Sequence, residues 1–248
     1  MKAIIVKTDQ ENRPLVWQEV PDPVYGPAEV LVDSHAAGLN RADLMQRAGN
    51  YPPPPGAPDI LGLEMAGRIA AVGAEVTGWQ VGDRVCALLA GGGYAEQVSV
   101  PYQLLMPVPP GWSYEQAAAV PEVFYTAFVN LFMEAALQPG ETVLIHGGAS
   151  GVGTAAIQLA RAAGCRVFTT VGTAEKAARC TELGAELAIN YKQEDFAERI
   201  EIHTRGDGVD VILDMVGAAY LERNLRLLKG RGRLVFISML SGAKTEIN

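Results

Sequence analysis

The chain has 248 residues, of which 49% are hydrophobic and 19% are charged, so it can bury the core of one or two domains. Its 20 basic and 28 acidic residues give a net charge of −8, which repels nucleic-acid phosphates and anionic lipids. We therefore expect no nucleic acid and no membrane as partners. The three cysteines lack C-x-x-C spacing, and their odd number argues against a disulfide framework. Because the N-terminus lacks a signal-peptide core and no apolar run is as long as a membrane span, we expect a cytoplasmic protein.

The first half of the sequence is typical of a β domain. Short β-branched or alternating runs are separated by Gly and Pro turn signals, at a spacing that indicates a barrel or sandwich. The expected strands are Ala3–Val6, Leu15–Val20, Glu29–Ser34, Met65–Val72, Arg84–Leu89 and Ala95–Val100. One helix is expected at Arg41–Ala48, ended by Gly49, and the rigid run Pro52–Gly56 after it excludes regular helix and central strand.

The second half changes to an alternation of strands and helices. A capping-box pattern at Ser113–Gln116 precedes the apolar stretch 117–137, in which Pro121 predicts a kink. The expected strands are Thr142–His146, Arg166–Val171, Leu187–Asn190, Val209–Asp214 and Arg233–Ser238. The expected helices are Val152–Ala163, Ala174–Leu183, Glu194–Thr204 and Ala219–Lys229. This alternation predicts a parallel, doubly wound sheet, with domains at 1–120 and 121–248.

A glycine-rich motif lies between the first strand and the first helix of this second half. Gly148, Ser150 and Gly153 occupy the three positions of G-x-G-x-x-G, with Ser replacing the middle glycine. Small residues let the backbone approach a pyrophosphate, towards which the following helix directs its free N–H groups. A plain glycine turn is the alternative, but the strand before and the helix after favour a dinucleotide loop. Its candidate residues are Gly148, Ala149, Ser150, Gly151, Val152 and Gly153.

The residues after the second strand of this half favour NADPH over NADH. An NAD-binding site usually has an acidic residue there to bind the ribose hydroxyls, and the strand end Thr169–Thr173 contains none. Lys176 and Arg179 could instead face a 2′-phosphate, joined by Tyr191 after the third strand. The alternative is a solvated helix face on which both cations pair with acidic neighbours. The candidate residues for this position are Gly172, Thr173, Lys176 and Tyr191.

Several short motifs carry a resemblance to a known family. They are Gly38–Asp43, Gly62–Gly67, Gly82–Val85 and Gly93–Glu96, together with Leu39–Arg47 and Tyr51–Gly56. In this order the sequence resembles the medium-chain dehydrogenase/reductase superfamily, and within it the zinc-independent quinone oxidoreductase branch. The resemblance covers essentially the whole chain. It implies an α/β protein with a GroES-like β-barrel catalytic domain followed by a Rossmann doubly wound parallel sheet.

Two residues indicate whether this chain could bind zinc as some members of the superfamily do. Zinc-dependent members of the superfamily have Cys where Asn40 stands and His where Leu63 stands. Asn and Leu cannot replace thiolate and imidazole as zinc ligands, so we predict no metal site. A reductase without a Lewis acid suits an acceptor that is already electrophilic, such as a quinone or an activated alkene.

The resemblance also implies roles for individual residues. It places Asn40 beside the nicotinamide as a hydrogen-bonding group and Thr126 near the same ring. It places Tyr51 in the substrate pocket, where the phenol could bind a quinone oxygen or give it a proton. The alternative for Tyr51 is packing on the proline run. For Asp43 and Arg47 we expect an i,i+4 ion pair that shapes the loop.

The place of four other residues in the sequence predicts a role for each. Asp214 and Ser238 end the fourth and fifth expected strands, and open α/β sheets bind ligands at such ends, so Ser238 is a further cofactor candidate. His146 is expected to be a neutral imidazole bonded to backbone. Cys86, which has no basic neighbour in sequence, is expected to pack in the core.

The sequence stops at Asn248, just after the fifth expected strand, whereas the resembled enzymes continue. We therefore expect a strand edge that either stays exposed in a shortened chain or is covered by a partner chain, and we predict a homodimer. The predicted function is an NADPH-dependent, zinc-free reductase that transfers hydride to a quinone. The alternatives are reduction of an enone or enoyl thioester, and a non-catalytic NADP(H)-binding protein.

Overall fold

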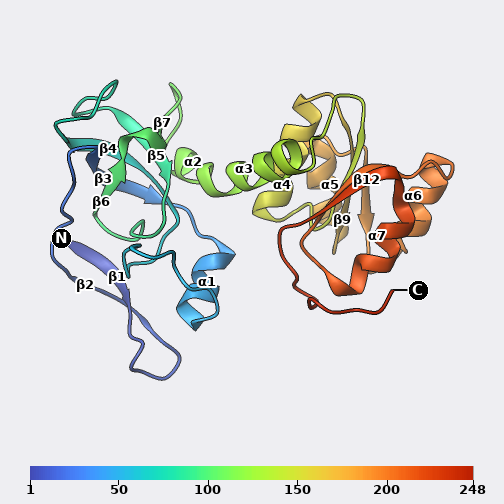
Figure 1. The fold of residues 1–248 in the computed structure, drawn as a ribbon, viewed down its shortest axis with the longest axis horizontal. Helices are drawn as coiled ribbons and strands as arrows, with labels where there is room; N and C mark the ends of the chain where they lie inside the picture. The colour runs from blue at the N-terminus through green and yellow to red at the C-terminus, as the bar shows by residue number, and fades with distance from the viewer. Residues whose placement is uncertain (248) are drawn as a thin grey trace. The chain divides into compact units, whose positions relative to one another are not determined.

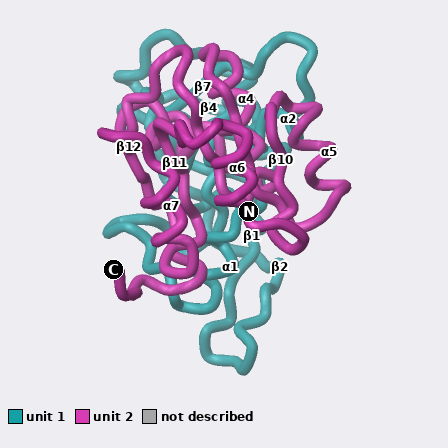
Figure 2. Tube along the Cα trace, turned by 90° about the vertical axis from the view of Figure 1, so that its right-hand side faces the viewer, with its two compact units in different colours: residues 1–122 teal, residues 123–248 magenta. Residues whose placement is uncertain are grey.

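The structure, a computed structural model, describes residues 1–247 and divides into two compact units. The first comprises Met1–Glu122, and the second begins at Val123 (Figure 2). Each unit has its own β-structure and its own buried hydrophobic clusters.

The first unit is built on a five-stranded antiparallel sheet in the order β6-β3-β4-β5-β7. A separate antiparallel pair is formed by β1 and β2 (Figure 1). It is joined to the unit through a bridge between Ala3 and Ala95. The strands are β1 (Lys2–Val6), β2 (Leu15–Glu19), β3 (Glu29–Ala37), β4 (Glu64–Val72), β5 (Arg84–Leu88), β6 (Gln97–Pro101) and β7 (Leu105–Pro107). The helices are α1 (Arg41–Ala48), the 3₁₀ turn η1 (Tyr102–Leu104) and α2 (Tyr114–Ala118). Sequence analysis missed β7, which has only three residues.

Helix α1 has the bounds that the sequence predicted, because local signals define both of its ends. At its start the Asp43 carboxylate accepts the backbone N–H of Asn40 at 2.7 Å, and at its end Gly49 adopts a left-handed conformation with φ of +82°. The expected ion pair between Asp43 and Arg47 is wrong. The Arg47 guanidinium instead donates to the carbonyl oxygen of Arg13 at 2.8 Å, which ties the helix to the loop after β1.

The core of the first unit includes one of the cysteines. Cys86 on β5 is 3% exposed and packs with Ala66, Val108 and two alanines of α2, as its sequence context predicted. Burial raises the pKa of its thiol to about 11, with Glu64 adding to the shift. This cysteine is therefore an uncharged core residue at neutral pH.

The second unit contains a parallel five-stranded sheet in the order β10-β9-β8-β11-β12. The strands are β8 (Thr142–Ile145), β9 (Arg166–Val171), β10 (Leu187–Asn190), β11 (Val209–Asp214) and β12 (Leu228–Phe236). The helices are α3 (Pro121–Phe128), the π-helix η2 (Val129–Glu134), α4 (Gly151–Ala162), α5 (Ala174–Leu183), α6 (Phe196–Thr204), the 3₁₀ turn η3 (Ala218–Tyr220) and α7 (Leu221–Leu227). The strand order reverses between β8 and β11, and open sheets of this kind bind ligands at the carboxyl ends of the strands beside such a reversal.

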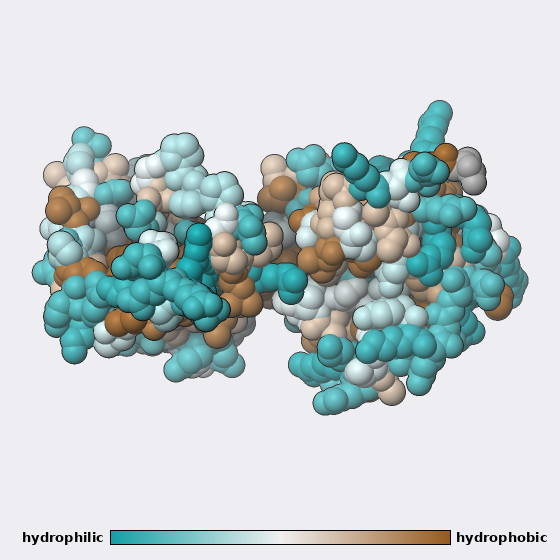
Figure 3. Space-filling view, turned by 90° about the horizontal axis from the view of Figure 1, so that it is seen from below, coloured by the Kyte–Doolittle hydropathy of each residue, from teal (hydrophilic) through white to brown (hydrophobic). Residues whose placement is uncertain are grey.

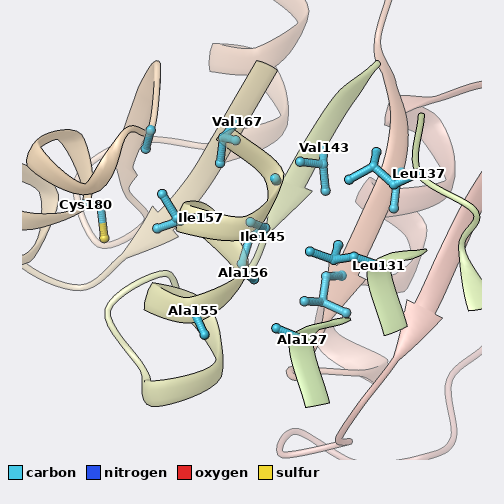
Figure 4. Close-up of a cluster of buried hydrophobic side chains, with 14 of the residues drawn as sticks. Ala127, Leu131, Leu137, Val143, Ile145, Ala155, Ala156, Ile157, Val167 and Cys180 are labelled. Atoms are coloured by element: carbon cyan, nitrogen blue, oxygen red, sulfur yellow. The ribbon is translucent and has the colours of Figure 1, made fainter. Parts of the chain in front are cut away.

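Helix α4 packs on this sheet through small residues. In Figure 4, Ala156 and Ile157 of α4 lie against Ile145 of β8 and Val167 of β9 within one buried cluster. Alanine side chains allow close approach of helix and sheet, and the complete burial of these residues stabilises the unit by the hydrophobic effect. The packing fixes the first turn of α4 next to the carboxyl end of β8.

Two predicted helices differ from the structure at their ends. Pro121 does not kink a continuous helix but begins α3, because proline lacks the N–H that a helix interior requires and suits the first turn. The predicted helix Ala219–Lys229 ends already at Leu227, whose carbonyl oxygen lies against the Cα of Gly208 and leaves no room for a side chain there. Residue 228 then pairs with β11, and regular pairing resumes at Arg233, where the strand was predicted.

The helix that begins at Pro121 changes its winding at Val129. Its hydrogen bonds become five residues apart in the π-helix η2, where the Ala135 N–H donates to the carbonyl oxygen of Asn130 at 3.1 Å. The side-chain amide of Asn130 donates to the carbonyl oxygen of Thr126 at 2.8 Å, at the point where the α-helix passes into the π-helix. The wide turn is thus joined to the α-helix by a side-chain hydrogen bond.

No helix within residues 1–247 combines the length and the apolar character that crossing a membrane requires. The face shown in Figure 3 presents apolar residues in separate patches among hydrophilic ones.

One surface ion-pair group gives the second unit a predictable pH dependence. Glu186 accepts two hydrogen bonds from the Arg166 guanidinium, at 2.7 and 3.0 Å, and lies 3.0 Å from Nε2 of His203. Arg166, and after it His203, lower the pKa of the Glu186 carboxyl to about 2. Because the folded-state pKa is lowered, this pairing contributes stability above about pH 4.5 that is lost as the pH falls towards 2.

We expect Glu186→Gln to lower the free energy of unfolding by at most about 1 kcal/mol at pH 7, since the carboxylate is 39% exposed and screened by solvent. Urea unfolding at a series of pH values measures this, and the difference from the unsubstituted protein should shrink below pH 4.5. Glu182→Gln is the matched control, because its pair with Arg179 is more exposed and should contribute less. A loss for Glu186→Gln that stays constant from pH 7 to pH 3 would contradict the pairing.

Candidate functional site

The glycine-rich loop runs from the end of β8 into α4 and has a defined hydrogen-bonding pattern. Gly147 has φ of +64°, the Gly148 N–H donates to the carbonyl oxygen of Thr170, and the Ser150 N–H donates to that of Gly147. The Ser150 hydroxyl oxygen accepts the Gly153 N–H at 3.0 Å and so caps α4. This explains why serine replaces the middle glycine of the fingerprint.

The first and last glycines of the fingerprint are required by close packing. A Cβ placed on Gly148 would overlap the Thr169 hydroxyl, and one on Gly153 would overlap the carbonyl oxygen of Gly147 and the Cα of Gly148. The loop backbone therefore lies directly against the start of α4. Among the described residues, the N–H groups of Gly151 and Val152 have no hydrogen-bond partner, so the positive end of this twelve-residue helix is available to an anion.

A second group of candidates lies at the carboxyl ends of β9 and β10. A Cβ placed on Gly172 would lie 3.0 Å from the Tyr191 hydroxyl and 3.6 Å from Cε of Lys192, so these two side chains border the glycine. The Thr173 hydroxyl caps α5 by accepting the Lys176 N–H at 3.3 Å. Sequence analysis did not single out Lys192. Its position directly after Tyr191 was the available signal.

The two cations of α5 differ in their surroundings. Arg179 pairs with Glu182 at 2.8 Å, as the solvated-face alternative proposed. Lys176 is exposed, and its ammonium has no ion-pair partner within residues 1–247. Of these two cations, only Lys176 is thus available to bind a further anion.

The remaining cofactor candidates of the second unit come from three different segments of the chain. Thr126 is half-buried on α3, Ala149 is half-buried and packs against the main core cluster, and Ser238 is half-buried two residues after β12.

His146 is neutral as predicted, because complete burial lowers its pKa to about 4. Its predicted backbone partner is wrong: both ring nitrogens bond to side chains, Nδ1 to Thr170 and Nε2 to Asn224.

In the first unit, Asn40 is held by a buried carboxylate. Its amide nitrogen donates to Oε1 of Glu64 at 2.7 Å, and the Glu122 N–H donates to Oε2 at 2.9 Å. Glu64 is 2% exposed, and burial raises the pKa of its carboxyl although both hydrogen bonds oppose the shift. Asn40 therefore has a fixed orientation, supplied by a residue that sequence analysis did not single out.

The Asp43 carboxylate completes this group. It accepts the Tyr94 hydroxyl at 2.7 Å and the Asn40 backbone N–H at 2.7 Å. Burial and the hydrogen bond to Asp43 raise the pKa of Tyr94, so the phenol stays protonated and donates. The loop that carries Asn40 is thus fixed through both its backbone and its side chain.

Tyr51 lies three residues after the end of α1 and precedes the proline run. Its side chain is 44% exposed, so the phenol is accessible in the first unit. Asn40 and Tyr51, the two candidates for acceptor binding, flank α1 at its opposite ends.

Comparison with known proteins identifies the family. Residues 26–110 match the family described as alcohol dehydrogenase GroES-like domain, and residues 151–248 match the family described as zinc-binding dehydrogenase. The quinone oxidoreductase of Pseudomonas aeruginosa is 41% identical over 225 residues, which cover 90% of this chain and 69% of that protein. The chain belongs to the medium-chain dehydrogenase/reductase superfamily, and the predicted fold class is confirmed.

Solved structures and longer relatives extend this comparison. Escherichia coli quinone oxidoreductase complexed with NADPH is 35% identical with a TM-score of 0.86, and covers 100% of this chain and 76% of that one. The CurK enoyl reductase is 33% identical with a TM-score of 0.88, and covers 99% and 75%. The chain spans only 10% of the length of the mycobacterial phthioceranic/hydroxyphthioceranic acid synthases, with which it is 40% identical over 212 residues, 86% of this chain.

The zinc implied by one family description does not fit the residues present. At the two positions in question, the Asn40 amide is engaged with Glu64 and Leu63 has no donor atom. Within residues 1–247, no group of three or more His, Cys, Asp or Glu side chains could hold a metal ion.

Proposed function

We propose that this protein is an NADPH-dependent, zinc-free reductase that transfers hydride to a quinone. The observation that carries the proposal is the loop at Gly148–Gly153, whose packed glycines leave two free N–H groups at the start of α4. Similarity to quinone oxidoreductases, including one solved with NADPH, supports the same conclusion.

The residues of the second unit are proposed to bind and select the cofactor. The N–H groups of Gly151 and Val152 would bind the pyrophosphate, and Lys176 with Tyr191 would bind the 2′-phosphate beside Gly172. Lys192 adds a cation next to the same glycine. Thr126 and Ser238 are proposed as further cofactor contacts. When bound, NADPH supplies the hydride, and the chain supplies orientation and electrostatics.

The residues of the first unit are proposed to bind the acceptor. Asn40 uses one amide N–H on Glu64 and keeps a second N–H to donate to an oxygen of the cofactor or the quinone. The accessible Tyr51 phenol would donate to a quinone oxygen and give it the proton that reduction requires. The expected homodimer and the expected cytoplasmic location stay predictions.

Cofactor selection is tested by fluorescence titration with NADPH and with NADH. We expect tighter binding of NADPH, and we expect Lys176→Ala to raise the NADPH Kd roughly tenfold while leaving the NADH Kd unchanged, since only NADPH carries the 2′-phosphate. Arg179→Ala on the same helix is the matched control, because this arginine is paired with Glu182. Preference for NADH, or an equal effect of Lys176→Ala on both cofactors, would contradict the assignment.

Two rival functions are separated by assays with purified protein. Similarity to the CurK enoyl reductase favours an enone or enoyl thioester as the second candidate acceptor, so rates with a quinone and with these acceptors are compared directly. If NADPH binds but none of them accelerates its oxidation, the protein is a non-catalytic NADP(H)-binding protein.

A further inference from the structure

Four buried polar side chains lie in the second unit beneath the glycine-rich loop. Thr170 comes from β9, His146 follows β8, Asn224 lies on α7 and Asp214 ends β11. Their exposed fractions are 0% or 1%. Buried polar groups are costly unless they are paired, and here each is paired with the next.

The end of this series at Asp214 sets the direction of every hydrogen bond in it. The carboxylate accepts the N–H groups of Val216 at 2.6 Å and Gly217 at 3.2 Å, and the side-chain amide of Asn224 at 3.0 Å. Because the Asn224 nitrogen faces this carboxylate, its carbonyl oxygen faces Nε2 of His146, at 2.8 Å, and must accept. The hydrogen of the neutral imidazole therefore lies on Nε2.

The same argument continues to the loop. Nδ1 of His146 carries no hydrogen, so it accepts the Thr170 hydroxyl hydrogen across 3.0 Å. The Thr170 oxygen is then left to accept the Gly147 N–H, at 3.3 Å. Five groups thus form one chain. Gly147, Thr170, His146 and Asn224 each donate to the next group, and the Asp214 carboxylate accepts at the end. Such aligned hydrogen bonds polarise one another in a medium of low polarity.

We propose that Thr170, His146 and Asn224 are positioning residues that hold the entry of the dinucleotide loop at Gly147 in its binding conformation. The proposal rests on the proposed binding of NADPH. Phe196 and Tyr220 surround the imidazole edge-on, with ring centroids 4.9 and 4.8 Å away, and exclude other partners. Without the Thr170 hydroxyl, the Gly147 N–H would lose its acceptor, and the backbone bond from Gly148 to the Thr170 carbonyl oxygen would be left to hold the loop entry to β9.

The direction of the chain is tested first in the protein without cofactor. Two-bond ¹H–¹⁵N correlation spectra of the imidazole distinguish the tautomers, and we expect the hydrogen of His146 on Nε2 at neutral pH. Asp214→Asn removes the charge that orients Asn224 and should yield a mixture of tautomers. A hydrogen on Nδ1 in the unsubstituted protein would overturn the proposal, whether or not any variant folds.

The effect on the loop is tested with a matched pair of substitutions. Thr170→Val removes the hydroxyl at constant shape, whereas Thr170→Ser keeps it. We expect the valine variant to shift the Gly147 amide resonance and to raise the NADPH Kd roughly three- to tenfold, and the serine variant to stay within about twofold. Equal Kd values for the two variants would overturn the proposal. If the unsubstituted protein does not bind NADPH, the proposed function fails, while the tautomer still reports whether the chain exists.

Discussion

Gly153→Ala is expected to abolish tight NADPH binding and to lower the thermal stability of the second unit. The added methyl group would overlap the carbonyl oxygen of Gly147 and the Cα of Gly148, which are backbone atoms that no side-chain rotation can move away. Overpacking of this kind typically costs about 1–3 kcal/mol, and here the structure can relieve it only by opening the loop. Opening the loop moves the free N–H groups of α4 away from the proposed pyrophosphate site.

Fluorescence titration with NADPH and thermal melting measure these two effects. We expect the NADPH Kd to rise more than about tenfold. Gly230→Ala is the matched control, because a Cβ on Gly230 meets no atom within 4 Å and its backbone conformation is open to other residues. If Gly153→Ala binds NADPH as tightly as Gly230→Ala does, the loop is not the pyrophosphate site.

Glu64→Leu is expected to lower both the stability of the first unit and the rate of turnover. Leucine avoids the desolvation of a buried carboxylate, but it leaves the Asn40 amide and the Glu122 N–H without an acceptor. Two partly buried donors that lose their acceptor cost about 2–4 kcal/mol. A released Asn40 amide also loses its orientation, which should lower the proposed NADPH-dependent quinone reduction roughly 10- to 100-fold. Glu64→Gln should have an intermediate effect, because its single carbonyl oxygen serves one donor instead of two.

Urea unfolding and steady-state rates with a quinone measure these effects. Glu29→Leu is the matched control, since Glu29 also accepts two hydrogen bonds, from the Gly26 N–H and the Ser99 hydroxyl, at a place unrelated to Asn40. It should lower stability and leave the turnover of the folded enzyme unchanged. A Glu64→Leu enzyme that is destabilised but fully active would show that Asn40 needs no such support.

The features that sequence analysis located well depend on neighbours in the chain. The bounds of α5 at Ala174–Leu183 were predicted because its Thr173 cap and its Gly184 end are local signals. The fingerprint was likewise visible in the six consecutive residues Gly148–Gly153. Even the replacement of its middle glycine by Ser150 has a local cause, since the hydroxyl caps α4.

The features that were missed depend on partners far apart in sequence. Glu64 is 24 residues from Asn40, and His146 is 78 residues from Asn224. The predicted pair of Asp43 with Arg47 followed a local rule that is worth only about 0.2–0.5 kcal/mol on a helix surface. It failed because Asp43 is buried and accepts the Tyr94 hydroxyl, 51 residues away. Local spacing cannot reveal such competition.

The π-helix η2 has a consequence for how this protein tolerates changes in length. A π turn holds one residue more than an α turn. Deleting one residue between Val129 and Glu134 would let the segment rewind as α-helix, while α3 before it and β8 after it keep their alignment. Elsewhere in a helix, a deletion rotates all later side chains by about 100°. This stretch is therefore where single-residue insertions and deletions among homologues would be expected to accumulate.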